Sequence, residues 1–393
     1  MSDTYGVVLG ISGSISAYKS LDVIRLLRRH NVRITPILSP NAHRFVTPWC
    51  VETLSESPIH HDGVSNGQID HLAHSKANVF VVCPASANTL SKLAHGRCDD
   101  ALSASFLNFE GPKIVFPAMH TTMYTNPITQ ANIATLQRNG VIVIDPDTGD
   151  LACGDVGDGR LPHPSCIVDV TMAHAQASLN FNGKHCVITC GGTVVPIDPV
   201  RVLSNRASGQ SGHVLANVLV GFGARVTLIR PVTHPTLRRV SCVFAPTVLD
   251  MDQACQAQQS DCDVFIMNAA VSDFTVPRHQ KKHPRHAPLS LTFTPTTDIL
   301  ASFNEHAPDH CVSVGYCLSD QPNLVDIAIK KRHQKKCTLM VANHPDAIGA
   351  NQRTITLINQ QDASTTVSGS LQTIAVHVSR MIAEAIPTRA KSN

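Results

Sequence analysis

The stretch Tyr5–His30, YGVVLGISGSISAYKSLDVIRLLRRH, predicts the fold of the N-terminal half. Tyr5–Ile11 is an apolar run typical of a buried strand, and Ala17–His30 carries apolar residues at helical spacing. Gly10–Ser14 joins them with small residues, which let backbone N–H groups at a helix start approach a phosphate. The motif is neither a Walker loop nor G-x-G-x-x-G, so it favours a mononucleotide phosphate over ATP or NAD. For this motif alone, a plain tight turn remains the alternative.

The alternation of strand and helix continues along the chain and predicts an α/β fold with two doubly wound, mainly parallel sheets. In the first half, the further expected strands are Arg33–Leu38, Val79–Cys83, Lys113–Pro117 and Val141–Ile144, and the expected helices are Ser86–His95, Pro127–Arg138 and Ser165–Ser178. A new series begins near Phe181, with expected strands His185–Cys190, Arg225–Ile229, Val264–Met267, Val312–Tyr316 and Thr338–Ala342, and expected helices Ser211–Phe222, Val248–Gln258, Gln321–His333 and Ser370–Ala385. We therefore expect two domains, residues 1–180 and 181–393.

Composition argues against several classes of protein. Of the 393 residues, 43% are hydrophobic and 16% charged, as in an ordinary soluble protein, and a net charge of +3 argues against nucleic-acid or membrane partners. The N-terminus has no signal-peptide pattern, and no apolar stretch approaches the roughly 20 residues of a transmembrane helix, so we expect a cytoplasmic location. The 13 cysteines form no C-x-x-C pair, and neither they nor the 21 histidines predict a protein metal site.

The glycine-rich stretch Ala152–Arg160, ACGDVGDGR, sets one cysteine among two acids, an arginine and three glycines. It has no apolar periodicity, so we expect a mobile surface loop. The carboxylates of Asp155 and Asp158 favour the protonated thiol of Cys153, which would make this cysteine a proton donor rather than a nucleophile. A surface loop that happens to contain a cysteine is an equally good interpretation of this stretch alone.

Other polar segments follow expected strands, where ligands bind in sheets of this kind. In the first half these are Pro84–Asn88 and Pro117–Tyr124, and in the second half Thr189–Thr193. Ser204–Gly209 opens an expected helix, so that its N–H groups, Asn205 and Arg201 would converge on an anion; a well-capped helix start is the alternative.

A basic run, Lys330–Lys336, lies on an expected helix. Such runs are usually solvated faces. However, Lys331 and Lys335 are four residues apart and would face one phosphate chain together.

With these motifs the chain resembles the flavin-dependent cysteine decarboxylases. Over nearly its whole length it resembles the bifunctional coenzyme A biosynthesis family that joins 4′-phosphopantothenoylcysteine decarboxylase to phosphopantothenate–cysteine ligase. The resemblance implies a flavodoxin-like flavoprotein domain that binds FMN through Ser12, Gly13, Ser14, Ser39, Ser86, Asn88 and Met119. It also implies that His71 is the catalytic histidine and that Cys153 protonates the product. The family's Pro-x-Met-Asn-x-x-Met motif has asparagine where this chain has His120, whose imidazole would reach the substrate carboxylate from a different position.

In the second half the resemblance implies a Rossmann-like ligase domain that forms an acyl-cytidylate from CTP, with magnesium bridging the triphosphate. Asn205 matches the residue that processes this intermediate, and Arg201 its neighbouring anion ligand. The other nucleotide-binding positions fall on Ala269, Asp273, Asp298, Tyr316, Lys331 and Lys335. The functional lysine of the family's Lys-x-Lys-Lys loop is replaced by His279, which is shorter and mostly neutral at pH 7.

The resemblance thus predicts a bifunctional enzyme that couples cysteine to 4′-phosphopantothenate and decarboxylates the product to 4′-phosphopantetheine. Its partners would be these small molecules and further copies of itself, with trimeric flavin domains and paired ligase domains. The alternative is a flavin-binding relative that regulates or scaffolds with impaired activity, which His120 and His279 favour. An NAD-dependent dehydrogenase is disfavoured because neither half has G-x-G-x-x-G followed by the acidic residue that binds ribose.

Overall fold

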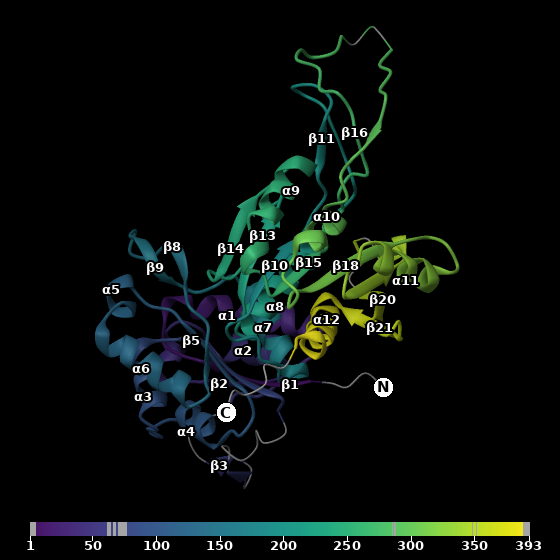
Figure 1. Ribbon diagram of the computed structural model, residues 1–393. Coiled ribbons are helices and arrows are strands. Elements are labelled where there is room, and N and C mark those ends of the chain that lie inside the picture. The colour runs from purple at the N-terminus through teal and green to yellow at the C-terminus, as the bar shows by residue number, and fades with distance from the viewer. Residues whose placement is uncertain are drawn as a thin grey trace. The chain divides into compact units, whose positions relative to one another are not determined.

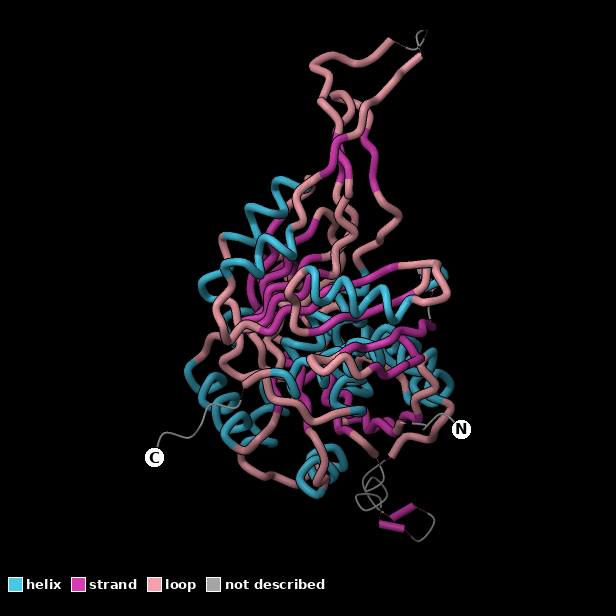
Figure 2. The backbone as a smooth tube through the Cα atoms, turned by 45° about the vertical axis from the view of Figure 1, so that its right-hand side comes forward, coloured by secondary structure: helices cyan, strands magenta, loops and turns pink. Residues whose placement is uncertain are grey.

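A computed structural model describes residues 5–60, 64–65, 68–69, 77–284, 286, 288–347, 349–350 and 352–387. The chain divides into two units, Met1–Ser178 and Leu179–Asn393, and each contains a sheet of its own. Figure 2 shows the strands of these sheets in magenta among cyan helices. Within the described residues, no helix combines the length and apolar character needed to cross a bilayer.

The sheet of the first unit has five parallel strands in the order β2-β1-β5-β6-β7. They are β1 (Gly6–Ile11), β2 (Arg33–Leu38), β5 (Val79–Ala85), β6 (Lys113–Pro117) and β7 (Ile142–Val143). Every residue of β1 and β5 is buried, because helices cover both faces of a parallel sheet. Numbered along the chain, the order is 2-1-3-4-5, which is flavodoxin-like and places the topological switch point between β1 and β5.

Helices cover both faces of this sheet (Figure 1). They are α1 (Tyr18–Arg29), α2 (Pro48–Ser55), α3 (Ala87–Ala94), α4 (Ala101–Asn108), α5 (Thr121–Tyr124), α6 (Pro127–Arg138) and α7 (Pro164–Gln176). On one face, Phe80 and Val82 share a core with Leu90 of α3, Leu102 of α4 and Ile133 of α6. On the other, α1 and α7 pack against each other. A short antiparallel pair, β3 (Val64–Ser65) and β4 (Gln68–Ile69), stands apart from the sheet.

An antiparallel hairpin follows β7 and contains the whole glycine-rich stretch Ala152–Arg160. Its strands are β8 (Asp147–Asp150) and β9 (Val156–Arg160), and Leu151–Asp155 forms the turn. The expectation of an irregular loop is therefore wrong for the second half of that stretch. Glycine and aspartate are poor strand formers, so the sequence of β9 does not predict a strand. The strand forms because it pairs with β8.

The sheet of the second unit has eight strands in the order β14-β13-β10-β15-β18-β19-β20-β21. They are β10 (His185–Thr189), β13 (Arg225–Arg230), β14 (Val240–Phe244), β15 (Val264–Met267), β18 (Val312–Leu318), β19 (Leu339–Asn343), β20 (Gln352–Ile358) and β21 (Ser364–Ser370). The first six in the sheet are parallel and follow the Rossmann order 3-2-1-4-5-6, with the switch point between β10 and β15. The last two are antiparallel and extend one edge.

Five helices flank the second sheet. They are α8 (Gln210–Gly221), α9 (Val248–Gln256), α10 (Ile299–His306), α11 (Leu324–Gln334) and α12 (Leu371–Ala385). Helices α9, α10 and α11 share one core, in which Phe265 stacks on Phe303 with ring centroids 3.8 Å apart. Helices α8 and α12 pack against each other.

An arm projects from the body of the second unit in Figure 1, where β11 and β16 lie side by side. It is formed by the antiparallel pairs β11 (Val194–Pro196) with β12 (Val202–Ser204), and β16 (Phe274–Thr275) with β17 (Thr294–Pro295). The two pairs are connected where the His279 N–H donates to the Ile197 carbonyl at 2.8 Å.

The α/β class with two mainly parallel sheets is confirmed. Every expected strand and helix is present within a few residues of its expected ends. The sequence did not predict α2, α4 and α10, whose apolar residues lie in short segments, the mostly exposed edge strand β14, or the hairpin of β20 and β21. Strand β21, STTVSGS, is mostly exposed, so it has no apolar alternation to reveal it.

Candidate functional sites

The predicted flavin-binding residues of the first unit lie just beyond the carboxyl ends of its parallel strands. Ser12–Ser14 follow β1, Ser39 follows β2, Ser86 follows β5 and Met119 follows β6. Ser86 caps α3 by accepting the Thr89 N–H at 3.3 Å, and Asn88 lies exposed in the first turn of that helix. These positions surround the switch point, where small residues and a helix N-terminus suit an anion.

Ser12 also has a structural role. Its side chain is fully buried, donates to the Pro84 carbonyl at 2.8 Å and accepts the Ser86 N–H at 2.8 Å. The hydroxyl therefore connects the ends of β1 and β5. At the next residue, a Cβ on Gly13 would lie 2.6 Å from the Cβ of Asn41, so only glycine fits without a shift.

Ser14 and Ser39 both precede short 3-10 helices, η1 (Ile15–Ala17) and η2 (Pro40–Arg44). The Ser14 hydroxyl accepts the Ser16 N–H and donates to the Ala118 carbonyl, each at 3.4 Å. The Ser39 side chain makes no cap hydrogen bond, although it is only 7% exposed. The predicted catalytic residue His71 lies outside the described residues.

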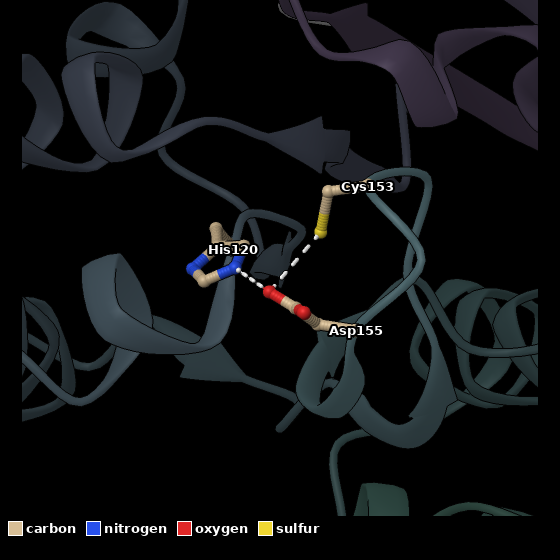
Figure 3. Close-up of side chains that lie close together, drawn as sticks. All are labelled: His120, Cys153 and Asp155. Carbon is tan, nitrogen blue, oxygen red and sulfur yellow. Dashed lines mark hydrogen bonds and ion pairs between the residues drawn. The ribbon is translucent and has the colours of Figure 1, made fainter.

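His120, Asp155 and Cys153 converge at the tip of the β8–β9 hairpin (Figure 3). His120 Nε2 lies 2.8 Å from Asp155 Oδ2, and the Cys153 Sγ donates to the same oxygen at 3.6 Å. This pairing lowers the pKa of Asp155 below its ordinary value, chiefly through the hydrogen bond from His120 and then through that from Cys153. Asp155 thus connects the imidazole to the predicted proton donor, a contact that the sequence reading did not foresee.

The segment that carries His120 is fixed to the base of the hairpin. The Met119 N–H donates to the Gly159 carbonyl at 3.1 Å. Gly159 has φ +138°, and a Cβ there would lie in contact with the Met119 carbonyl oxygen, so glycine is required. At the N-terminus of α5, His120 Nδ1 lies 2.9 Å from the Thr122 hydroxyl and accepts the Thr122 N–H at 3.3 Å.

A cavity of about 460 Å³ lies beside these groups in the first unit. Its lining includes Ser14, Met119, His120 and Cys153 among the predicted residues. Lys19 and Arg160 add two cations, which the sequence reading did not single out as ligands. Burial lowers the pKa of Lys19, whose ammonium donates to the Leu161 carbonyl at 3.3 Å.

In the second unit, a cavity of about 770 Å³ lies at the carboxyl ends of the parallel strands. Seven of the nine predicted ligase residues line it: Asn205, Ala269, Asp273, Asp298, Tyr316, Lys331 and Lys335. They come from segments spread over 130 positions of sequence, from 205 to 335. The fold therefore gathers the residues that the resemblance had selected.

Asn205 is held by its side-chain amide, which donates to the carbonyls of Ala270 and Val271 at 3.2 Å each. Gly192 lies directly beneath, and a Cβ there would lie 2.7 Å from the Asn205 carbonyl oxygen. Gly209, with φ +77°, ends the loop at the start of α8. Gly192 and Gly209 thus keep the Asn205 loop close to the ends of β10 and β15.

Lys331 and Lys335 come from α11 and its C-terminal cap, and both reach the cavity. Lys335 forms an ion pair with Asp298 at 2.9 Å, and Asp298 caps α10 by accepting the Ala301 N–H at 3.1 Å. The basic run is not a uniformly solvated face, because Arg332 is 8% exposed and bonds Asp362 at 2.7 Å. The face with Lys331 and Lys335 is the one that lines the cavity.

Arg201 and His279 do not line this cavity. Both lie on the arm, where Arg201 forms an ion pair with Asp198 at 2.7 Å and donates to the His283 carbonyl at 3.2 Å. The backbone and Arg201 hydrogen bonds hold the pKa of Asp198 well below its ordinary value despite the opposing effect of burial. The roles predicted for Arg201 and His279 in the ligase reaction remain predictions.

Arg353 of β20 is a cavity residue that sequence reasoning missed. Burial lowers the pKa of its guanidinium and raises that of the neighbouring Tyr316 phenol. The arginine lies in a strand that follows no ligand motif, and the antiparallel pairing of β19 and β20 reveals its position.

His213 underlies the loop that carries Asn205. Its Nδ1 donates to the Gly209 carbonyl at 2.8 Å and its Nε2 accepts from Arg230 at 2.9 Å. Burial lowers its pKa to about 4, so the folded state holds neutral imidazole. The unfolded chain protonates near its ordinary value of about 6.5.

We therefore expect the second unit to lose stability as pH falls from about 6.5 towards about 4, because the unfolded state then binds more protons. Urea unfolding of the full chain at a series of pH values, followed by hydrogen exchange of peptides from β10 and α8, measures this loss. His213→Leu should flatten the dependence, whereas His306→Leu at an exposed histidine should not. Equal slopes for both variants would contradict the assignment.

Comparisons with known proteins match both units. A family model described as Flavoprotein matches residues 1–176, and one described as DNA/pantothenate metabolism flavoprotein C-terminal domain matches residues 181–386. The chain is 34% identical over 347 residues to the Coenzyme A biosynthesis bifunctional protein CoaBC of Vibrio vulnificus, covering 86% of each chain. It is 34% identical over 361 residues to CoaBC of Bacillus subtilis, covering 89% of this chain and 88% of that one.

Two solved structures each cover about half of the chain. The crystal structure of the C-terminal domain of a CoaBC protein is 26% identical and covers 52% of this chain and 96% of that chain, with a TM-score of 0.46. The FMN binding protein AtHal3 is 29% identical and covers 43% of this chain and 95% of that chain, with a TM-score of 0.39.

Proposed function

The chain belongs to the CoaBC family of bifunctional coenzyme A biosynthesis proteins, and we propose from this premise which of its residues perform the two reactions. It is an enzyme of coenzyme A biosynthesis with a flavoprotein decarboxylase half and a ligase half. We assign decarboxylation of 4′-phosphopantothenoylcysteine to residues 1–180 and CTP-dependent ligation of cysteine to 4′-phosphopantothenate to residues 181–393. The comparisons give no support to a purely regulatory relative.

The residues at the switch point of the first unit fit FMN. The hydroxyls of Ser14, Ser39 and Ser86 and the N-terminus of α3 supply donors for a phosphate and a ribityl chain. Bound FMN would oxidise the substrate's cysteine thiol so that carbon dioxide can leave. Because Gly13 has no side chain, its backbone can come close to a bound phosphate. Met119 follows β6 at the same edge of the sheet.

In this half, the protein's own groups bind the substrate and move one proton. His120 Nε2–H, which donates to Asp155, would donate instead to the substrate carboxylate. The Cys153 thiol would then give its proton to the carbon of the product, and Asp155 keeps that thiol pointing into the site as its hydrogen-bond acceptor. Lys19 and Arg160 balance the charge of an anionic substrate in the adjacent cavity.

In the ligase half, the cavity would bind CTP and the acyl-cytidylate. Lys331 and Lys335 are placed to bind the triphosphate, and magnesium would be carried mainly by the phosphate oxygens. The Asn205 amide lies at the edge where the reacting carboxyl carbon would meet cysteine. We expect Arg201 and His279 to contribute from the arm, and the exposed Val202 and Leu203 there support pairing of ligase halves.

The observation that carries this proposal is the convergence of seven predicted ligase residues on one cavity. The test is a mass-spectrometric product assay with purified protein, 4′-phosphopantothenate, cysteine, CTP and magnesium under anaerobic conditions. The proposal expects 4′-phosphopantetheine. Accumulated 4′-phosphopantothenoylcysteine would place a defect in the first half, and no CMP release with no bound flavin would refute the proposal.

Lys335 provides a test of the nucleotide site. Lys335→Met removes a cation from the cavity and leaves Asp298 as an uncompensated anion there. We expect the KM for CTP to rise by about tenfold, the equivalent of about 1.4 kcal/mol, with a smaller change in kcat. Lys330→Met, on the exposed side of α11, is the matched control. If both variants shift KM equally, the effect is one of net charge and the assignment of Lys335 is wrong.

A further inference from the structure

The three side chains at the tip of the β8–β9 hairpin form a set of metal ligands. An imidazole, a thiol and a carboxylate offer His120 Nε2, Cys153 Sγ and an Asp155 oxygen, all within 4.8 Å of one another. Among the residues that the structure describes, they are the one group of three such ligands this close together. In Figure 3 all three point towards a common centre. Nitrogen, sulfur and oxygen donors of these types are those that Zn²⁺ prefers.

We propose that His120, Cys153 and Asp155 bind a thiophilic divalent cation, Zn²⁺, at the mouth of the decarboxylase cavity. Bound Zn²⁺ would occupy the thiol and the imidazole together and so switch this half off. The site depends on His120, which stands where the family motif has asparagine, because an asparagine at this position would supply no imidazole nitrogen.

The geometry requires only a small adjustment. Zinc bonds of about 2.0–2.3 Å set ligand atoms about 3.4–3.8 Å apart in a tetrahedron. The Cys153 Sγ and Asp155 Oδ2 are already 3.6 Å apart, whereas His120 Nε2 and Asp155 Oδ2, at 2.8 Å, must separate by roughly half an ångström. The turn that carries Cys153 and Asp155 is exposed and can supply that movement. The cavity lined by His120 and Cys153 leaves space for water as the fourth ligand.

The protons balance without a further reactant. The Cys153 thiol loses its proton to solvent when the sulfur binds the metal. On His120 the proton moves from Nε2 to Nδ1. Nδ1 then gives up the Thr122 N–H that it accepts in the empty site and donates to the Thr122 hydroxyl at 2.9 Å, the kind of outer hydrogen bond that a zinc-bound histidine usually makes. Two anionic ligands neutralise Zn²⁺, so the loaded site is neutral, whereas the empty site carries the single negative charge of Asp155 near Lys19 and Arg160.

The chain offers a matched control for the histidine. His163 caps α7 as His120 caps α5, with its Nδ1 2.8 Å from the Ser165 hydroxyl and accepting the Ser165 N–H at 3.2 Å. For the cysteine, Cys98 is another exposed thiol of the same unit. Asparagine also caps helices well, so His120→Asn keeps the cap and removes the zinc ligand.

The experiment titrates Zn²⁺ into the purified, flavin-containing full chain against a chromophoric chelator and counts tight equivalents. We expect wild type, His163→Asn and Cys98→Ser each to bind one Zn²⁺ per chain tightly. His120→Asn and Cys153→Ser should lose this tight binding, with an affinity for Zn²⁺ at least about 100-fold weaker. X-ray absorption at the zinc edge should show one sulfur and otherwise nitrogen and oxygen ligands for that equivalent. Wild-type affinity in His120→Asn would overturn the proposal.

The inhibitory consequence rests on the proposed function and is measured separately. With each variant measured relative to its own zinc-free rate, Zn²⁺ should stop decarboxylation by wild type and His163→Asn but leave the rate of His120→Asn, whatever its size, unchanged. A chelator should restore the inhibited rates. The number of Zn²⁺ bound per chain does not depend on turnover. If Zn²⁺ binds as expected but does not inhibit decarboxylation, the metal site is confirmed and the role proposed for Cys153 is contradicted.

Discussion

Cys153→Ser should lower the rate of 4′-phosphopantetheine formation by about 10²- to 10⁴-fold, the usual contribution of a positioned general acid. A serine hydroxyl is a far weaker acid than a thiol and would donate its proton slowly. Asp155 would still accept a hydrogen bond at this position, so the hairpin should keep its conformation. Because carbon dioxide leaves before the proton arrives, we expect up to one equivalent of it per bound flavin, with an equal amount of a product that lacks two hydrogens. Release should then stop, because without oxygen no oxidant removes the two electrons that the product has left behind.

Anaerobic incubation with 4′-phosphopantothenoylcysteine, followed by mass spectrometry and carbon dioxide measurement, distinguishes these steps. Cys98→Ser changes an exposed thiol of the same unit and should behave as wild type. Normal 4′-phosphopantetheine formation by Cys153→Ser would show that another group donates the proton. Loss of carbon dioxide release as well would instead assign Cys153 to an earlier step.

Asn205→Asp should reduce CTP-dependent ligation by about 10²-fold, as expected when a group that positions a reacting segment is lost and the segment shifts by about 1 Å. The change is nearly isosteric, but a carboxylate cannot donate to the carbonyls of Ala270 and Val271 and would repel both. The loop that lines the cavity should then move away from the strand ends. Decarboxylation of added 4′-phosphopantothenoylcysteine should be unaffected.

CMP release and cysteine-containing product, measured separately, show which ligase step fails. We expect the acyl-cytidylate to accumulate if Asn205 acts after activation. Asn323→Asp is the matched control, because Asn323 precedes α11 and its side chain makes no cap hydrogen bond. Equal rates for Asn205→Asp and wild type would remove Asn205 from the mechanism.

Sequence patterns predicted the buried framework well because parallel strands are continuous apolar runs. Strands such as Lys113–Pro117 and Val264–Met267 and the helix Pro127–Arg138 have the expected bounds. Turn residues at the ends of β1, β5 and β10 then indicated where both candidate sites lie, since the carboxyl ends of parallel strands meet at one edge.

Elements that depend on pairing rather than on burial escaped this reasoning. Strand β9 consists largely of glycine and aspartate, and β20, which follows no ligand motif, brings Arg353 into the cavity of the second unit. The bond between His120 and Asp155 joins residues 35 positions apart, through a hairpin that was not expected. No local pattern encodes such a contact.

The hairpin also sets the effective concentration of the thiol. A cysteine on a flexible loop samples a large volume, and its ordering entropy opposes every productive encounter. Here β8 and β9 pair along their length, and Met119 anchors the base through Gly159. The turn Leu151–Asp155 is itself closed by two backbone hydrogen bonds, from the Leu151 N–H to the Asp155 carbonyl at 2.8 Å and from the Gly154 N–H to the Leu151 carbonyl at 2.9 Å. The fold therefore leaves Cys153 a small volume to sample. Much of the entropy of bringing acid and substrate together is therefore lost at folding, before any substrate binds.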